Sequence, residues 1–160
     1  MSATLHLVCG KIAAGKSTLT TKLGLAPYTI VLREDDWLPG LYPNEITTLA
    51  DYVRCATRLR SLIGPHVVQL LKLDLSVVLD FPANTLNNRA WMRSLFEAAG
   101  TAHQLHWLDV PDAVCKARLQ RRNDSGQHPY TVSEADFDLF TSHFAPPTPA
   151  EGFNLVIHRP

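Results

Sequence analysis

The segment Gly10–Ser17, with the sequence GKIAAGKS, constrains the fold more than any other part of this chain. It matches the pattern G-x-x-x-x-G-K-[ST], in which backbone N–H groups of a glycine-rich loop surround a phosphate. The apolar run 5–9 before it is predicted to be a buried strand, and 16–23 after it a helix whose N-terminus favours an anion. A chance glycine-rich turn does not explain this strand–loop–helix context, so the sequence predicts a phosphate-binding loop.

Each part of this loop has an expected role toward a nucleoside triphosphate. The Lys16 ammonium is expected to reach the outer phosphates, and the Ser17 hydroxyl to bind Mg²⁺. The residues expected to contact the nucleotide are Gly10, Lys11, Ile12, Ala13, Ala14, Gly15, Lys16, Ser17 and Thr18. ATP and Mg²⁺ are therefore the predicted cofactors.

Length and composition predict one domain over residues 1–160, with enough apolar residues (46%) for a core. Lysine plus arginine and aspartate plus glutamate both number 15, which gives no general attraction to nucleic acid but leaves a local basic patch open. The three scattered cysteines favour reduced thiols in a cytoplasmic protein. We find no signal-peptide pattern, and no apolar run of the roughly 18 to 20 residues that a membrane span needs.

Strand and helix patterns alternate along the chain. Strands are predicted at 5–9, 29–32, 76–80, 105–108 and 153–158. Helices are predicted at 16–23, 45–63, 65–73, 87–99 and 111–122, with a last one capped by Ser133, and loops at 34–44 and 123–131. Five strands separated by helices predict an α/β fold with a parallel sheet and helices on both faces.

Acidic residues follow the second predicted strand, where a parallel sheet binds its ligands. A kinase needs a carboxylate there to accept the proton of the attacking hydroxyl, and Asp35 is the candidate, with Asp36 beside it. Trp37 is either a platform for the substrate or a packing residue. A solvated acidic turn is the alternative for this segment.

Asp80 ends the third strand as the acid of a Walker-B-like segment and is a candidate to hold Mg²⁺ through water; alternatively it stabilises the phosphate-binding loop. Phe81 follows, where hydrolytic ATPases of the AAA type usually have glutamate, so transfer to an organic acceptor is favoured. No Asn-Lys-x-Asp guanine motif occurs.

Several arginines are candidates for the site. Arg118 and Arg122 are four residues apart on one helix, where Arg122 is expected to stabilise the transferring phosphoryl group; cations pairing with a helix C-terminus are the alternative. Arg58 either meets the substrate or belongs to a solvated helix face. His6 and His106 are predicted to be packed strand residues, and we assign no metal to the histidines.

The chain resembles the small P-loop kinases that include chloramphenicol phosphotransferase, zeta toxins and the kinase domain of polynucleotide kinases. The segments that carry the resemblance are Cys9–Thr18, Glu34–Leu38, Val78–Phe81, Arg89–Trp91, Leu108–Pro111, Arg118–Asn123, and Phe144 with Glu151–Phe153. The resemblance implies an adenylate-kinase-like P-loop NTPase fold with a five-stranded parallel sheet in the order 2-3-1-4-5. It also implies a short lid at about 123–133, Asp35 as the base, and adenine near Arg118.

The expected function is an ATP-dependent phosphotransferase that acts on a hydroxyl of a small molecule, by analogy an antibiotic such as an aminoglycoside. The residues expected to bind that substrate are Asp36, Trp37, Arg58 and Arg89. A nucleic-acid partner is not expected, because long insertions and a basic groove are absent from the sequence. The alternatives are a polynucleotide 5′-hydroxyl kinase and a nucleotide-switched protein of the toxin–antitoxin type. The acceptor and the oligomeric state do not follow from the sequence.

Overall fold

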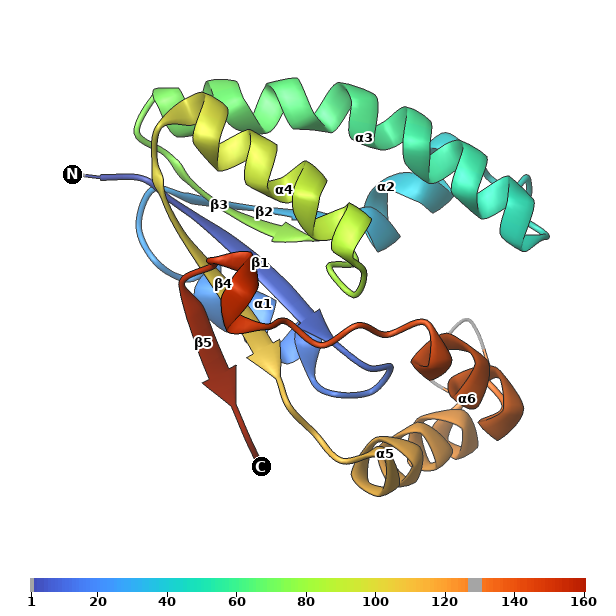
Figure 1. The fold of residues 1–160 in the computed structure, drawn as a ribbon. Helices are drawn as coiled ribbons and strands as arrows, with labels where there is room; N and C mark the ends of the chain where they lie inside the picture. Colours follow the sequence, from blue (N-terminus) through green and yellow to red (C-terminus); the bar gives the residue numbers. More distant parts are fainter. Residues whose placement is uncertain (1, 127–130) are drawn as a thin grey trace.

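A parallel five-stranded sheet forms the centre of the molecule in the computed structural model, which describes residues 2–126 and 131–160. Its strands are β1 (Thr4–Gly10), β2 (Thr29–Arg33), β3 (Ser76–Asp80), β4 (Ala102–Leu108) and β5 (Leu155–His158). Their order is β2-β3-β1-β4-β5, which confirms the predicted order. Figure 1 shows the helices on both faces of this sheet.

The sheet divides the apolar side chains between two cores. Alternate residues of a strand point to opposite faces, so Leu5, Leu7 and Cys9 of β1 enter the larger core, while Val8 enters the smaller one. The larger core is covered by α3 (Leu49–Lys72) and α4 (Leu86–Ala99). The cysteines at 9, 55 and 115 are free and buried, as expected of reduced thiols.

α1 (Lys16–Leu23) packs against β1 and β3 on the opposite face of the sheet. α2 (Glu34–Leu41), α5 (Asp112–Ser125) and α6 (Glu134–Ser142) lie toward the carboxyl ends of the strands, and the 3-10 turn η1 (Pro149–Glu151) precedes β5 (Figure 1). α5 and α6 lie together beyond the end of β4 (Figure 1). In residues 2–126 and 131–160, none of the helices has the length and apolar character of a membrane span.

The prediction of two helices at 45–63 and 65–73 was wrong, because α3 is continuous. It begins at Leu49, where Thr48 and Asp51 form a capping box. Pro65 lacks the N–H that would bond the carbonyl of Ser61, but both residues are exposed, so water can satisfy that carbonyl. Gly64 lets α3 approach α4, since a Cβ there would lie 3.3 Å from the side chains of Trp91 and Leu95.

The predicted loop at 34–44 was also wrong in its first part, which is α2. Three acids in the first turn favour the helix N-terminus, and Leu38 buries the inner face. Pro39 and Gly40 suggested a loop, yet both lie near the end of this helix, where lost hydrogen bonds matter least.

The expected lid at 123–133 is described only at its two ends, because residues 127–130 lie outside the described part of the chain. Residues 123–125 complete α5. The Asn123 side chain donates to the Val132 carbonyl at 2.7 Å and accepts from the Val132 N–H at 3.3 Å. Asn123 therefore joins the two ends of this segment.

Candidate active site

The segment Gly10–Ser17 connects β1 to α1 as a compact loop. Ala13 and Gly15 have positive φ angles of 62° and 106°, and Gly15 precedes the first turn of α1. A φ of 106° is strained for any residue with a side chain, which explains the glycine. At Gly10 a Cβ would meet Leu108 and Ala14 at 3.3 Å. The loop therefore has the close packing and curvature of a phosphate-binding loop.

Lys16 lies across this loop. Its Nζ donates hydrogen bonds to the carbonyl oxygens of Gly10 and Lys11, both at 2.8 Å. Desolvation lowers the pKa of the ammonium, while the carboxylates of Asp80 and Asp35 act to raise it. Lys16 is thus within electrostatic reach of both carboxylates that the sequence analysis assigned to the site.

Asn84 ties the start of the phosphate-binding loop to the segment after β3. Its Oδ1 accepts from the Gly10 N–H, and its Nδ2 donates to the Gly10 carbonyl, both at 3.0 Å. The backbone carbonyl of Asn84 also accepts from the Ala145 N–H at 2.8 Å. The sequence marked the ends of the strands as site segments, but nothing in it predicted this contact.

Asp80 ends β3 directly beside the end of β2. Its Oδ2 accepts from Arg33 at 2.8 Å and from the Thr20 hydroxyl at 3.0 Å. Arg33 in turn donates to Thr20 at 2.7 Å. Oδ1 takes no part in these contacts, so the carboxylate retains an oxygen for another ligand.

Ser17 and Asp80 fit a Mg²⁺ ion that is held mainly by water and phosphate. Ser17 is exposed at the start of α1, and Asp80 influences the neighbouring Lys16. Mg²⁺ usually binds to one or two carboxylates, substrate phosphates and several waters. The described residues contain no cluster of three or more ligands of the His, Cys, Asp or Glu type.

The first turn of α2 separates its acidic residues by their environment. Glu34 is buried, whereas Asp35, Asp36 and Trp37 are exposed. The ends of β2 and β3 are in register, with Arg33 opposite Asp80. Asp35, two residues beyond Arg33, therefore lies at the same edge of the sheet as the phosphate-binding loop.

Glu34 is held by two residues of α3. It accepts a short hydrogen bond from the Tyr52 hydroxyl, and its Oε2 lies 3.5 Å from Nη2 of Arg60. Burial raises the pKa of Glu34 against the opposing effects of Tyr52 and Arg60. Arg60 also donates to Asn88 at 2.9 Å and lies over the Trp91 ring. This network fixes α2 against α3, and the sequence analysis missed it.

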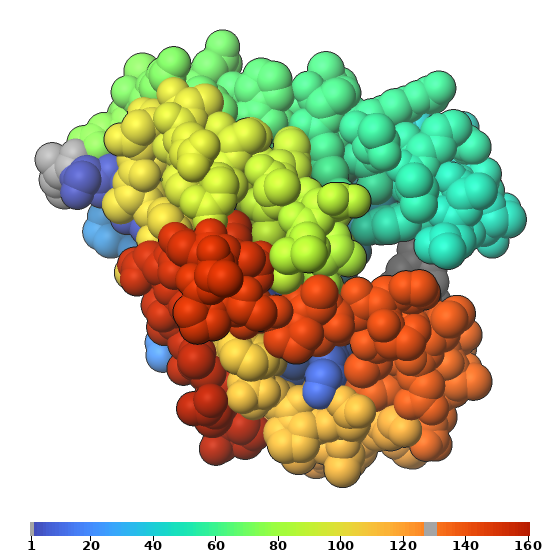
Figure 2. All heavy atoms as spheres, viewed as in Figure 1, coloured from blue at the N-terminus to red at the C-terminus, as the bar shows by residue number. Residues whose placement is uncertain are grey.

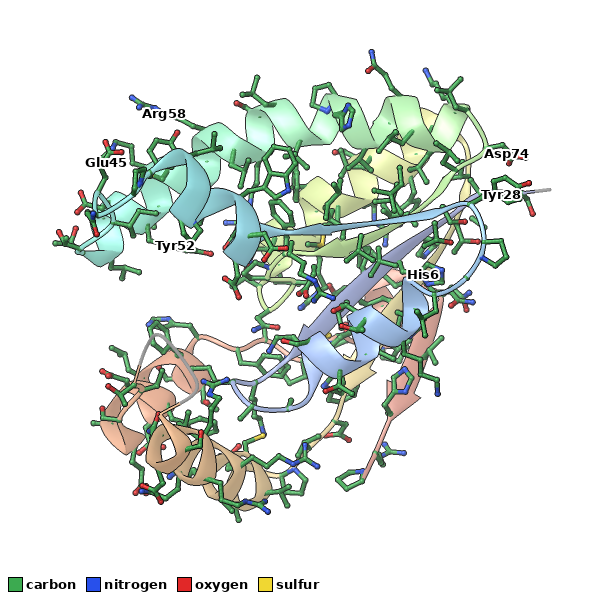
Figure 3. The ribbon with its side chains drawn as sticks, turned by 180° about the vertical axis from the view of Figure 1, so that it is seen from behind. His6, Tyr28, Glu45, Tyr52, Arg58 and Asp74 are labelled. Carbon is green, nitrogen blue, oxygen red and sulfur yellow. The ribbon has the colours of Figure 1, made fainter. Side chains whose placement is uncertain are left out.

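The predicted arginines have different surroundings. Arg118 donates to the Ala14 carbonyl of the phosphate-binding loop at 3.2 Å. Arg122 is half-buried, and among the described residues its Nε has no hydrogen-bond partner. Arg58 is exposed on the outer side of α3, away from the sheet (Figure 3). The structure therefore brings Arg118 to the phosphate-binding loop and does not bring Arg58 to it.

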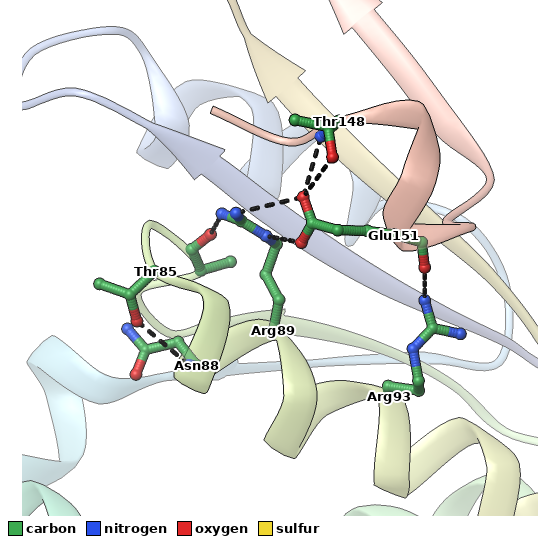
Figure 4. A network of polar contacts seen from close by, with 7 residues as sticks. Thr85, Asn88, Arg89, Arg93, Thr148 and Glu151 are labelled. Atoms are coloured by element: carbon green, nitrogen blue, oxygen red, sulfur yellow. Dashed lines mark hydrogen bonds and ion pairs between the residues drawn. The ribbon is translucent and has the colours of Figure 1, made fainter. Parts of the chain in front are cut away.

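Arg89 is a core residue rather than an exposed one. Its side chain is 1% exposed, and its Nε lies 2.7 Å from Oε1 of Glu151. Nη1 donates to the Ala83 carbonyl at 2.8 Å, and Nη2 lies 3.4 Å from Oε2 of Glu151 (Figure 4). The neighbouring Arg93 bonds the carbonyl of Glu151. All three nitrogens of Arg89 are engaged within the protein, which speaks against the expected contact with a substrate.

A groove beside the phosphate-binding loop has the size of a nucleotide subsite. Its volume is about 470 Å³, and its lining includes Gly15, Thr18, Lys22, Arg118 and His158. Arg118, near which adenine is expected, lines this groove. A separate hollow, bordered by α5 and α6, has blue atoms of the N-terminal part of the chain at its bottom on the face shown in Figure 2.

Comparisons with known proteins agree with this geometry. A sequence model of the family AAA_33, described as an AAA domain, matches residues 5–147. No curated protein matches the chain.

Solved structures share the fold at low identity. A candidate kinase from Chloroflexus aurantiacus is 19% identical with a TM-score of 0.74, and the match covers 99% of this chain and 85% of that one. APS kinase from Mycobacterium tuberculosis, solved with AMPPNP and APS, is 18% identical with a TM-score of 0.61. That match covers 99% of this chain and 89% of the APS kinase chain. A chain of the Pnkp1/Rnl/Hen1 RNA repair complex is 15% identical with a TM-score of 0.66, and the match covers 89% of this chain but 44% of that one. The fold is that of small P-loop kinases.

Proposed function

Because this chain belongs to the AAA_33 family of AAA domains, we propose that it is an ATP-dependent kinase that transfers the γ-phosphate to a hydroxyl of a small molecule. The observation that carries the proposal is the compact loop Gly10–Ser17, across which Lys16 lies with its Nζ 2.8 Å from the Gly10 and Lys11 carbonyl oxygens. Asp80 ends the neighbouring strand β3.

In the proposed reaction Asp35 is the general base. The acceptor oxygen forms a bond to the γ-phosphorus, while the bond from that phosphorus to the bridging oxygen of ADP breaks. The hydroxyl proton passes to the Asp35 carboxylate, which later returns it to solvent. Asp35 is exposed on the first turn of α2, so an acceptor can reach it from solvent.

Lys16 and Asn84 have different proposed roles at the phosphate-binding loop. To bind phosphate, the Lys16 ammonium must exchange its bonds to the Gly10 and Lys11 carbonyls for phosphate oxygens. Asn84 then still donates to the Gly10 carbonyl. The first glycine of the loop therefore keeps a hydrogen-bond partner after the lysine has moved.

Mg²⁺, when bound, neutralises charge on the β- and γ-phosphates. Ser17 and Oδ1 of Asp80 are the groups proposed to hold it. Arg122, which has an unpaired Nε among the described residues, is proposed to stabilise the transferring phosphoryl group. Arg118 is proposed to contact the nucleotide from the groove.

The charges around Asp35 favour a neutral or amine-bearing acceptor over a polyanion. Asp35 and Asp36 are both exposed. Of the nearby cations, Arg60 pairs with Glu34 and Arg54 with Asp51. Trp37, which is 39% exposed beside the acids, can pack against a sugar ring. An aminoglycoside has these properties, and we propose this class of antibiotic as the first to test.

The experiment is phosphoryl transfer from γ-labelled ATP to a panel of aminoglycosides, chloramphenicol, sugars, nucleosides and 5′-hydroxyl oligonucleotides. The matched control is the Lys16→Ala variant. We expect transfer to a neutral or amine-bearing polyol by the wild-type chain only. Transfer to oligonucleotides alone would contradict the proposed acceptor, and release of phosphate without transfer to any acceptor would contradict the kinase.

A further inference from the structure

Three histidines form a hydrogen-bonded row across three neighbouring strands. Nδ1 of His6 on β1 lies 3.1 Å from Nε2 of His106 on β4. Nδ1 of His106 lies 3.0 Å from Nε2 of His158 on β5. Successive ring centroids are 5.3 Å apart, with interplanar angles of 32° and 31°. The row thus connects the middle of the sheet to its edge through imidazole nitrogens alone.

His106 allows only two arrangements of protons in this row. It is 3% exposed, and burial together with His6 and His158 lowers its pKa to about 4. A neutral imidazole carries one N–H donor and one acceptor nitrogen. His106 therefore donates to one neighbour and accepts from the other, and it cannot accept from both.

This limit prevents both ends of the row from being protonated together. A protonated His6 must donate to Nε2 of His106, which then donates from Nδ1 to His158. A protonated His158 requires the opposite direction, in which His106 donates to His6. The row can consequently hold at most one extra proton, at one end or the other.

His158 is the end that faces the nucleotide groove. It lines the groove together with Lys22 of α1 and Arg118 of α5. Next to it in the chain, Arg159 pairs with Asp109 at 3.2 Å. Around His6, burial is the cause that lowers the pKa. Lys22 and Arg118 give the groove positive charge beside His158, so an anionic group is the ligand that this part of the groove favours.

We propose that His158 contacts the nucleotide and shares one proton with His6 through His106, so that nucleotide binding and protonation of His6 oppose each other. The inference rests on the proposed nucleotide binding in the groove. It adds a residue to that site and couples the site to the middle of the sheet. By linkage, protonation of His6 weakens nucleotide binding by the same factor.

The sign of the effect separates the row from ordinary electrostatics. A bound nucleotide is an anion and by itself raises the pKa of any nearby histidine. Through the row, however, it draws the shared proton to His158 and lowers the pKa of His6. Only the row produces opposite shifts at the two ends.

The test is NMR of the histidine side-chain nitrogens between about pH 5 and 8, with and without ADP. In the wild-type chain we expect ADP to raise the pKa of His158 and to lower that of His6 by about one unit. His103, which stacks on Phe96 with ring centroids 3.8 Å apart, is the internal control and should not change. In His106→Phe the shift at His6 should vanish or reverse.

A second measurement uses calorimetric titration of ADP into the wild-type and His6→Leu chains. The His6→Leu chain lacks the imidazole that competes with His158 for the proton. At acid pH, ADP should therefore bind this variant more tightly than the wild-type chain, by up to about tenfold for each pKa unit of coupling. At alkaline pH the two affinities should be equal. If ADP leaves the pKa of His6 in the wild-type chain unchanged or raises it, the proposed coupling through the histidine row is wrong. Amide shifts of residues 10–17 report ADP binding separately, so their absence would instead contradict the proposed nucleotide site.

Discussion

The ion pair between buried Arg89 and partly buried Glu151 gives a stability prediction that also tests the role of Arg89. Glu151→Gln keeps the shape of the side chain but removes the charge that neutralises a guanidinium with 1% exposure. Leaving one partner of a buried ion pair uncompensated costs about 3 kcal/mol or more. For a chain of this size each kcal/mol lowers Tm by about 2–4 °C, so we expect a fall of about 6–12 °C.

The control is Glu97→Gln, because Glu97 also pairs with an arginine, Arg93, but at 3.7 Å and with 61% exposure. An exposed pair of this kind contributes less than about 1 kcal/mol. Thermal unfolding followed by circular dichroism measures both variants. A Glu151→Gln fall no larger than that of Glu97→Gln would refute the assignment of Arg89 to the core, and Arg89 would again be a candidate for substrate binding.

The same pair predicts a pH dependence. Burial acts to raise the pKa of Glu151, but hydrogen bonds from Arg89 and Thr148 hold it below the ordinary value of 4.5. A carboxyl whose folded pKa is lowered stabilises the fold fully above 4.5 and loses this contribution as the pH falls through the folded pKa. The Tm difference between wild type and Glu151→Gln should therefore be constant near neutral pH and shrink below about pH 4.5.

Three further variants test the site. Lys16→Ala should abolish ATP turnover while the circular dichroism spectrum stays native, and wild-type turnover would contradict its role as the phosphate clamp. Arg122→Ala should lower kcat more than it raises the Kd for ATP, if it stabilises charge in the transition state; equal losses would make it a ground-state contact. Tyr52→Phe removes the donor to buried Glu34 and should cost about 1–3 kcal/mol in urea unfolding; no loss would show that this hydrogen bond is unimportant.

The strand order could be predicted because the pattern of strands, helices and the Gly10–Ser17 loop admits few topologies. The errors in the predicted helices came from single glycine and proline residues, whose local preference for turns was overridden by packing. Gly64 and Pro65 read as a break, yet α3 continues because Gly64 makes room for α4 and Pro65 faces solvent. Likewise Pro39 lies late in α2, where it does not prevent the helix.

The candidate site was predictable where a motif or a strand end carried the signal, as for Lys16, Asp80 and Asp35. Their catalytic roles stay predictions. What the sequence did not predict are contacts between residues far apart in the chain, such as Asn84 with Gly10 and Tyr52 with Glu34. No periodicity or spacing connects such residues, because only the folded sheet and helices bring them together. The histidine row was not predicted for the same reason, since His6, His106 and His158 share no local sequence pattern.

The proposed base depends on the position of Asp35 within α2. Because this segment is helical, Asp35 and Asp36 point about 100° apart around the axis rather than to opposite sides as in an extended loop. Asp36→Asn is therefore a matched control of the same chemistry on a different side of the helix. Asp36→Asn should reduce phosphoryl transfer less than Asp35→Asn does. Some loss is still expected, because α2 holds Asp36 next to Asp35.

The most direct measurement compares phosphoryl transfer by wild type, Asp35→Asn and Asp36→Asn to an acceptor identified in the panel, with ATP·Mg²⁺ affinity measured in parallel. Asparagine keeps the size of the side chain but cannot take the proton. We predict unchanged nucleotide affinity and a loss of transfer on the order of 10² to 10⁴ in Asp35→Asn, with a smaller loss in Asp36→Asn. A dead Asp36→Asn beside an active Asp35→Asn would contradict the choice of base, and full transfer by both would contradict general-base catalysis from α2.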